Sequence, residues 1–315
     1  MRSFLRKIVL FVMLFLSTIL LLYVSVCFIV GNQYNQNYQA SLIDKVERLE
    51  SISEPKIILV GNSNVCFGID SEMIESTFHM PVVNLGLHGG LGNAFHENIA
   101  KLHIGEGDIV IVCHTDYGDD GTIPDPGLAC LTLEWNVELW GILSVRDIFP
   151  VMKSSLDYVI KSVFFWKNGT GNLPTDDCYT RGAFNEYGDV AYERKESEYT
   201  FVEGDVKVPG ISSACVRRLN GFNRYVMDCG AVLLIAGYPI GDGEYTPNKS
   251  EYQEFQRELE EQLEAEVISD YTDYFFPYSY FYDSCFHLTD EGVRARTEQL
   301  IMDMKKYFEK ENISF

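Results

Sequence analysis

The sequence predicts an α/β domain built on a parallel sheet, preceded by an N-terminal hydrophobic span. Short apolar runs at 56–60, 82–85, 109–113 and 231–236 are typical of strands buried on both faces. Stretches at 70–78, 94–103, 212–229 and 250–264 have the length and composition of helices. This alternation of strands and helices indicates βαβ units, and the length of 315 residues suits one large domain.

The first element is a run of 23 uncharged, mostly apolar residues at 8–30. At 1.5 Å per residue it spans a bilayer about 30 Å thick. A cleaved signal peptide has a shorter apolar region and a small-residue cleavage site, so a retained single-pass anchor is favoured. Basic residues at positions 2, 6 and 7 predict a cytoplasmic N-terminus and an extracytoplasmic main domain at the cell membrane.

The segments that follow divide the chain into three parts. Residues 1–30 form the cytoplasmic tip and transmembrane anchor, 31–54 a polar stalk leading into a short helix, and 55–315 the α/β domain. A long insertion at about 117–210, with some helix near 127–165, interrupts the alternation. Residues 237–240 are predicted as a loop after a strand, 267–269 as a last short strand, and Thr289 as the cap of a C-terminal helix.

The charge of the chain excludes one class of partner. Its formal net charge is −21, and no acidic residue occurs in the first thirty positions. Nucleic acid is therefore not an expected partner, because phosphate binding needs clustered Lys and Arg. A domain this acidic should also be repelled by an anionic membrane surface. The cysteines beyond the anchor show no Cys-x-x-Cys pairing, so we expect no structural zinc, and nothing indicates an organic cofactor.

Candidate functional residues follow the predicted strands. Ser63, Gly86, the segment 113–117 and the segment 237–239 each come directly after one. Because ligands of parallel α/β sheets bind at the carboxyl ends of strands, this edge is the expected place for a site.

Ser63 begins the helix after the first strand, where it could serve as a nucleophile or simply as a helix N-cap. The segment lacks the second glycine of Gly-x-Ser-x-Gly, which disfavours an α/β-hydrolase elbow. Gly86 lies in a loop with four glycines in seven residues, and its N–H could face an oxyanion. That loop is not Gly-x-Gly-x-x-Gly and has no basic residue, so nucleotide binding is disfavoured.

Near the C-terminus, His287 could take a proton from Ser63, and Asp283 could orient the imidazole. The pair could equally be a turn aspartate and a histidine near a helix N-terminus. A cysteine nucleophile, either Cys66 or Cys285, acting with His287 is a further alternative.

Together, three segments resemble the SGNH, or GDSL-like, hydrolase superfamily, and more closely its membrane-anchored branch associated with acylation of cell-surface polymers. They are VGNSNVCFGID at 60–70, VNLGLHGG at 83–90 and YDSCFHLTDEG at 282–292, with GDIVIV at 107–112 similar to the third strand. The resemblance covers roughly 55–115 and 231–310. It implies a flavodoxin-like parallel sheet of about five strands flanked by helices.

The resemblance also implies residue roles. Ser63 would be the nucleophile, His287 the base and Asp283 its partner, with the Ser63 and Gly86 amides as oxyanion donors. Three features depart from the family pattern: Asn62 replaces an aspartate, CHTDY at 113–117 replaces the Gly-x-Asn-Asp block, and Asp283 precedes His287 by four positions instead of three. The second departure removes a third oxyanion donor.

We therefore expect an extracytoplasmic serine esterase or O-acyltransferase acting on acyl groups, most simply acetyl, of a cell-envelope carbohydrate. No metal or cofactor is implied. The alternative is a non-catalytic partner of an integral-membrane acyltransferase that uses the same cleft to bind the acceptor. The insertion could cover the site or could only close the edge of the sheet.

Overall fold

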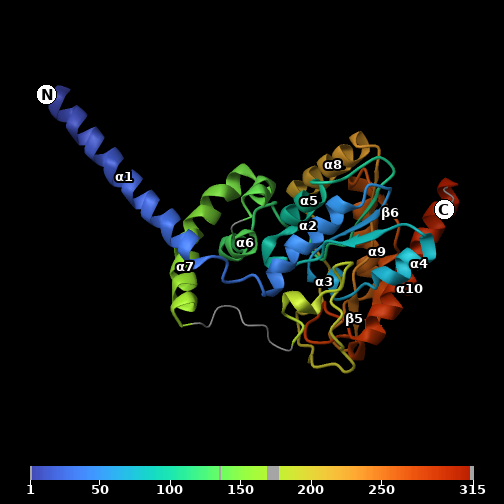
Figure 1. Ribbon diagram of the computed structural model, residues 1–315. Helices are drawn as coiled ribbons and strands as arrows, with labels where there is room; N and C mark the ends of the chain where they lie inside the picture. The colour runs from blue at the N-terminus through green and yellow to red at the C-terminus, as the bar shows by residue number, and fades with distance from the viewer. Residues whose placement is uncertain (1, 135, 169–176, 313–315) are drawn as a thin grey trace.

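The computed structural model describes residues 2–134, 136–168 and 177–312, and its centre is a five-stranded parallel sheet (Figure 1). The strand order is β2-β1-β3-β4-β6, which is the order 2-1-3-4-5 of flavodoxin-like sheets. The strands are β1 (Ile57–Val60), β2 (Val82–Asn84), β3 (Ile109–Val112), β4 (Val232–Ile235) and β6 (Glu266–Val267).

The apolar runs become strands because both faces of the sheet are covered. Alternate residues of β1 belong to two separate clusters of buried apolar side chains, with Ile58 and Val60 on one face and Ile57 and Leu59 on the other. Helices α2, α5, α8 and α9 cover the first face, and α4 and α10 cover the second. Their bounds are α2 (Ser41–Ser51), α4 (Ser71–Phe78), α5 (Asn93–Ala100), α8 (Ser213–Asp228), α9 (Lys249–Gln262) and α10 (Asp290–Glu311).

Side-chain caps fix where several of these helices begin. Asp70 accepts a hydrogen bond from the Met73 N–H at the start of α4. Thr289, the predicted cap, accepts one from the Gly292 N–H at the start of α10. The last strand begins one residue before the predicted segment. A second, two-stranded parallel sheet of β5 (Ile240–Asp242) and β7 (Phe275–Pro277) forms where a loop alone was expected.

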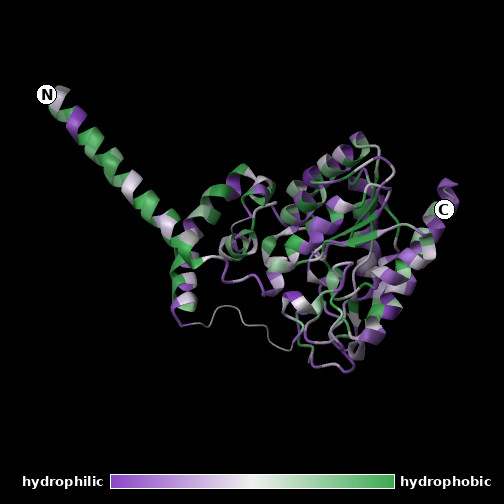
Figure 2. Ribbon diagram, viewed as in Figure 1, coloured by the Kyte–Doolittle hydropathy of each residue, from purple (hydrophilic) through white to green (hydrophobic). Residues whose placement is uncertain are grey.

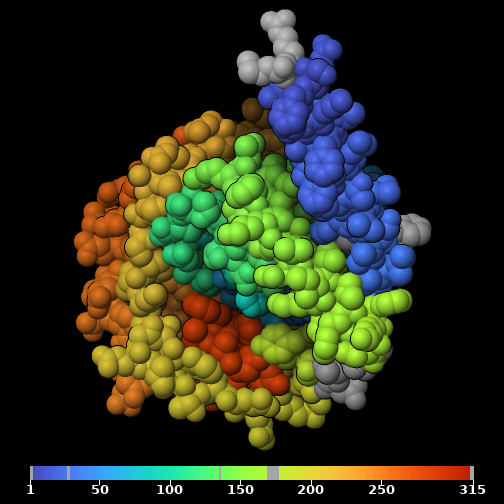
Figure 3. All heavy atoms as spheres, turned by 90° about the vertical axis from the view of Figure 1, so that its left-hand side faces the viewer, coloured from blue at the N-terminus to red at the C-terminus, as the bar shows by residue number. Residues whose placement is uncertain are grey.

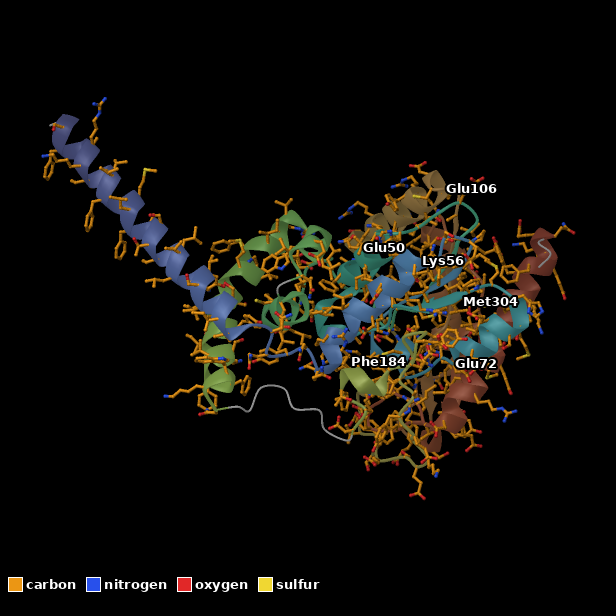
Figure 4. The ribbon with its side chains drawn as sticks, viewed as in Figure 1. Glu50, Lys56, Glu72, Glu106, Phe184 and Met304 are labelled. Carbon is orange, nitrogen blue, oxygen red and sulfur yellow. The ribbon has the colours of Figure 1, made fainter. Side chains whose placement is uncertain are left out.

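Residues 31–54 do not form the predicted stalk. After Gly31 the chain folds onto the domain through the short helix η1 (Tyr38–Ala40) and then α2. Leu42 and Leu49 of α2 are fully buried under the sheet. Lys45 is buried as well, and its amine donates to the Asn84 carbonyl oxygen and lies over the ring of Phe184. Figure 4 labels this phenylalanine. Burial lowers the pKa of Lys45 to about 8.

The insertion is a helical layer on one side of the domain. It holds α6 (Pro126–Leu133), the 3-10 helix η3 (Val137–Ile142), the long helix α7 (Val145–Asn168) and the short η4 (Arg181–Ala183). Its later part is tied to the core by the buried Asp189, which accepts hydrogen bonds from Ser71 and from the Asn84 side chain. Part of the insertion therefore supports the strand ends directly.

The N-terminal helix α1 (Arg2–Val30) extends away from the domain as an apolar rod (Figures 1 and 2). Its segment Ser3–Val26 is long and apolar enough to cross a membrane, and none of it is buried against the protein. It meets the rest of the molecule at α7.

Candidate active site

Ser63 lies on a tight turn between β1 and α3 (Ser63–Cys66). Asn62 caps this short helix, since its side-chain oxygen accepts the Asn64 N–H at 2.9 Å. The Asn62 amide also donates to the Thr115 hydroxyl after β3, at 2.7 Å. A Cβ at Gly61 would lie 2.5 Å from a methyl of Val65 and 2.9 Å from the Cys113 carbonyl oxygen. Glycine is therefore required where the chain leaves β1.

The Ser63 hydroxyl meets the imidazole of His287. Its Oγ lies 2.9 Å from Nε2, although the two residues are separated by 224 positions in the chain. Ser63 is half-buried, and its backbone N–H has no hydrogen-bond partner among the described residues. The hydroxyl and a free N–H are thus presented together at the carboxyl end of β1.

A hydrogen bond at the other ring nitrogen fixes the position of His287. Nδ1 lies 2.7 Å from a carboxylate oxygen of Asp283, and the other oxygen of Asp283 accepts a hydrogen bond from the Tyr179 hydroxyl. The Phe67 ring stacks on the imidazole at 4.0 Å between centroids, with 10° between the planes. The serine, the histidine and the aspartate therefore form one hydrogen-bonded chain, and the imidazole is fixed in plane and in direction.

Asp283 remains ionised in this arrangement. Burial alone raises the pKa of its carboxyl group, but the hydrogen bonds from His287 and Tyr179 outweigh burial and lower it below its usual value. The same contact acts oppositely on Tyr179, whose pKa is raised by burial and by the bond to Asp283. Asp283 is thus a hydrogen-bond acceptor toward His287 and fixes the tautomer with the proton on Nδ1.

Gly86 stands at the expected place but its N–H is not free. It donates to the side-chain oxygen of Asn84 at 2.9 Å, while the Asn84 amide donates to the Val65 carbonyl oxygen and to Asp189. The expected oxyanion donor is therefore engaged within the protein in this structure. Because Gly86 has no side chain, α3 can pack closely against this loop.

Adding a side chain at Gly86 should disrupt the site. A Cβ there would lie 2.5 Å from the Cys66 backbone nitrogen, and the nearby backbone of α3 cannot yield without moving Ser63. We expect Gly86→Ala to destabilise the protein by about 2 kcal/mol or more, because overpacked sites commonly cost 1–3 kcal/mol. Gly89→Ala in the same loop is the matched control, since its Cβ would meet nothing closer than 3.7 Å. Urea unfolding of both variants checks this, and equal midpoints would contradict it.

Arg296 of α10 stabilises the turn that carries Ser63. It is fully buried, and its guanidinium donates to the backbone carbonyl of Asn64 and, at 2.8 Å, to the Asn64 side-chain oxygen. A third donation at 3.4 Å reaches the Gly237 carbonyl oxygen after β4. Burial lowers the pKa of this guanidinium. Arg296 thus connects the C-terminal helix, β4 and the residue after Ser63.

We expect Arg296→Met to lower the free energy of unfolding by about 2–4 kcal/mol, because buried oxygens of Asn64 would lose their donors. Arg294→Met on the same helix is the control. The Arg294 side chain is 76% exposed and pairs with Glu298, four positions on, so its loss should change stability by about 0.5 kcal/mol or less. Chemical unfolding followed by circular dichroism measures both, and equal losses would show that Arg296 does not support the turn.

The cysteine alternatives are poorly placed for a thiolate nucleophile. Cys66 is 1% exposed, and its sulfur lies 3.0 Å from the Tyr38 hydroxyl. Burial raises the pKa of Cys66, and burial together with Asp205 raises that of Cys285 to about 11. Since the thiolate is the reactive form, both thiols are kept unreactive near neutral pH. The seven cysteines from Cys66 onward are free thiols.

The segment 113–117 serves the structure of the strand ends. The carbonyl oxygen of Cys113 accepts from the Asn64 amide, and Thr115 accepts from Asn62. His114 is buried against Glu97, and Tyr117 is buried with its hydroxyl 3.1 Å from that of Tyr271. The contacts with Asn62 and Asn64 tie the end of β3 to the serine turn.

A cavity of about 410 Å³ reaches Cys285 and Phe286, the two residues before His287, but neither Ser63 nor His287 belongs to its lining. Thr115, the partner of Asn62, and Phe286, the neighbour of His287, lie in its lining. The wall opposite comes from the end of the insertion, residues 205–210, and includes Lys207. Tyr238 and Tyr252 add aromatic surface. The end of the insertion therefore lines this cavity.

Several supporting residues could not be found from sequence. Tyr179 and Arg296 carry no motif, and Phe67 and Asn64 lie inside the serine segment without any feature that marks their contacts.

No protein-family model matches the chain, and a search of curated proteins finds no match. The site must therefore be judged on its geometry.

Proposed function

We propose that the protein is a membrane-anchored serine esterase or O-acyltransferase that acts on acyl groups, most simply acetyl, of a cell-envelope carbohydrate. The observation that carries this proposal is the hydrogen-bonded chain from Ser63 through His287 to Asp283. Such a chain is the arrangement that activates a serine hydroxyl for acyl transfer.

In the first half-reaction His287 Nε2 accepts the proton of Ser63 as Oγ attacks the acyl carbonyl carbon. The imidazolium that forms is stabilised by the Asp283 carboxylate. When the carbonyl re-forms, the bond to the leaving oxygen breaks and that oxygen takes the proton from Nε2. The acyl group is then an ester on Ser63. Water or a sugar hydroxyl attacks it by the same steps in reverse, and Oγ regains its proton.

The tetrahedral oxyanion would be bound by the Ser63 N–H, the free donor at the turn. Gly86 supplies a second donor in this proposal only if its N–H turns away from Asn84. One oxyanion donor is worth about 10²–10³ in rate, so this engagement predicts slow turnover in the absence of the true acceptor.

The cavity that reaches Phe286, next to His287 in the chain, supports a carbohydrate acceptor or a carbohydrate-linked ester. Its volume falls in the range of small-molecule sites. Lys207 and Asp116 in the lining add hydrogen-bonding groups of both charges.

The location in this proposal follows from α1. Its apolar length suits a single span, and the basic residues Arg6 and Lys7 near its start favour a cytoplasmic N-terminus. The α/β domain would then lie outside the cell membrane, where envelope polymers are found.

The second candidate is a non-catalytic acceptor-binding partner of an integral-membrane acyltransferase. The engaged N–H of Gly86 favours it, because binding an acceptor needs no oxyanion donor.

Turnover of p-nitrophenyl acetate by the full chain in detergent distinguishes the two. The enzyme is expected to release one equivalent of nitrophenolate in a burst and to turn over faster when a polysaccharide acceptor is added. Release at the rate of buffer alone, with and without acceptor, would favour the binding partner.

A further inference from the structure

One face of α7 exposes a continuous apolar stripe. Six residues at intervals of three or four positions lie on it, and each is between 56% and 87% exposed. This spacing puts them on one side of the helix. They are Val145, Phe149, Met152, Leu156, Ile160 and Phe164. A stripe this long on a surface helix needs a covering surface.

The charges beside the stripe differ from those of the chain as a whole. Helix α7 carries four cations, Arg146, Lys153, Lys161 and Lys167, all exposed. Of its two acids, Asp147 is buried and accepts hydrogen bonds from Ser144 and the Ile123 N–H, which leaves one exposed acid. The chain overall has a formal charge of −21. A basic helix with an apolar face, in a protein otherwise this acidic, has the charge and pattern of helices that bind anionic lipid surfaces.

The position of α7 is fixed next to the end of the predicted span. Tyr34 follows Val30, the last residue of α1, by four positions, and its ring packs against Phe165 and Tyr158 of α7 at 5.6 and 5.7 Å. The Tyr34 N–H and the Tyr158 hydroxyl also donate to the same oxygen of Glu134. Four extended residues reach at most about 14 Å. The C-terminal half of α7 therefore lies close to where α1 ends.

We propose that α7 lies in the headgroup layer of the membrane, with its apolar stripe in the lipid and its cations toward anionic headgroups. The proposal requires that α1 span the bilayer, as in the proposed function. Figure 2 shows the apolar colour of α1 continuing onto α7 where the two helices meet. The repulsion expected from the net charge does not apply to this face, because its local charge is positive.

The same short connection sets the height of the site above the membrane. Tyr38 follows Val30 by eight positions and touches the Cys66 sulfur in the helix that begins with Ser63. Eight extended residues reach at most about 28 Å. Seen from the side of α1, the C-terminal part of the chain comes to the surface directly below α6 and α7 (Figure 3). With α7 in the interface, the serine site would face substrates held at the membrane surface.

Photo-crosslinking tests the proposal without using enzyme activity. The full chain carries p-benzoylphenylalanine at Met152 or Leu156 of the stripe, or at the exposed Glu258 of α9 as control. Each protein is reconstituted into nanodiscs of phosphatidylcholine and phosphatidylglycerol. The wild-type chain and Ser63→Ala are used as backgrounds. We expect lipid adducts at 152 and 156, none at 258, and equal yields in both backgrounds.

Charge reversal provides the second measurement. Lys153→Glu with Lys161→Glu is expected to lower the adduct yield from phosphatidylglycerol several-fold in mixed nanodiscs. Lipid adducts absent at 152 and 156, or as frequent at 258, would overturn the proposal. Adducts to a second copy of the chain in place of lipid would overturn it as well and would identify a protein interface.

Discussion

Replacing Ser63 with alanine is expected to lower acetyl-ester turnover by a factor of about 10⁴ or more, while leaving the fold unchanged. The side chain supplies the attacking oxygen, and its loss removes covalent catalysis altogether. The hydroxyl is half-buried and, among the described residues, bonds to His287 alone, so stability should change by about 1 kcal/mol or less. Initial rates with p-nitrophenyl acetate, beside a melting curve, measure both effects.

Two controls make the result specific. Ser250→Ala changes an exposed serine of α9 and should retain full activity. Cys66→Ala and Cys285→Ala should each keep activity within about ten-fold, since neither sulfur bonds to His287. Turnover of Ser63→Ala equal to that of Ser250→Ala would remove the serine mechanism, and inactivation by iodoacetamide that persists in Ser63→Ala would favour a thiol.

Replacing Asp283 with asparagine is expected to lower kcat by about 10³–10⁴. An amide at this position can donate to Nδ1, which would leave Nε2 protonated and unable to accept the serine proton. Tyr179→Phe, which removes the second partner of Asp283 and a longer 3.3 Å contact with His287 Nδ1, should cost far less, about ten-fold. A much larger loss of kcat in Asp283→Asn than in Tyr179→Phe would show that Asp283 acts on His287 directly and that Tyr179 only supports Asp283. Equal losses would mean that Asp283 is not the acid that acts on His287.

The lowered pKa of Asp283 also predicts how the stability difference between wild type and Asp283→Asn depends on pH. A carboxyl group whose pKa is depressed on folding contributes stability above its unfolded value of about 3.9. That contribution is lost as the pH falls through the lower, folded value. The stability difference between wild type and Asp283→Asn should therefore be constant near neutral pH and shrink below about pH 4. Thermal unfolding at several pH values measures the difference, and a difference that grows on acidification would contradict the direction of the shift.

The main strands were predictable because each is buried on both faces, and its sequence is therefore an unbroken run of apolar residues. Ile57–Val60 and Ile109–Val112 are the clearest cases, and both lie at full burial in the centre of the sheet. Helix starts were predictable where a side chain caps them, as at Thr289. The pairing of Ser63 with His287 was one option that the residue types allowed, and the resemblance favoured it, since 224 positions separate the two and no local pattern encodes such a contact.

Other features depended on tertiary packing and left no sequence signal. The segment 31–54 is rich in polar residues, yet Lys45 and Tyr38 are buried because their polar ends find partners in Asn84 and Cys66. The Gly86 N–H was expected to be free, but a neighbouring side chain two positions earlier in the chain accepts it. The apolar residues of α7 have helical spacing, but spacing alone does not tell whether such a stripe packs on the core or stays exposed.

The most direct test of the catalytic assignment is the site and dependence of covalent labelling by a fluorophosphonate, read by peptide mass spectrometry on the full chain. The phosphonyl group should be attached to Ser63 at one equivalent per chain, and His287→Ala should slow labelling by a factor of about 10³ or more because the hydroxyl would lack its base. Labelling on another residue, or at the same rate without the imidazole, would contradict the account.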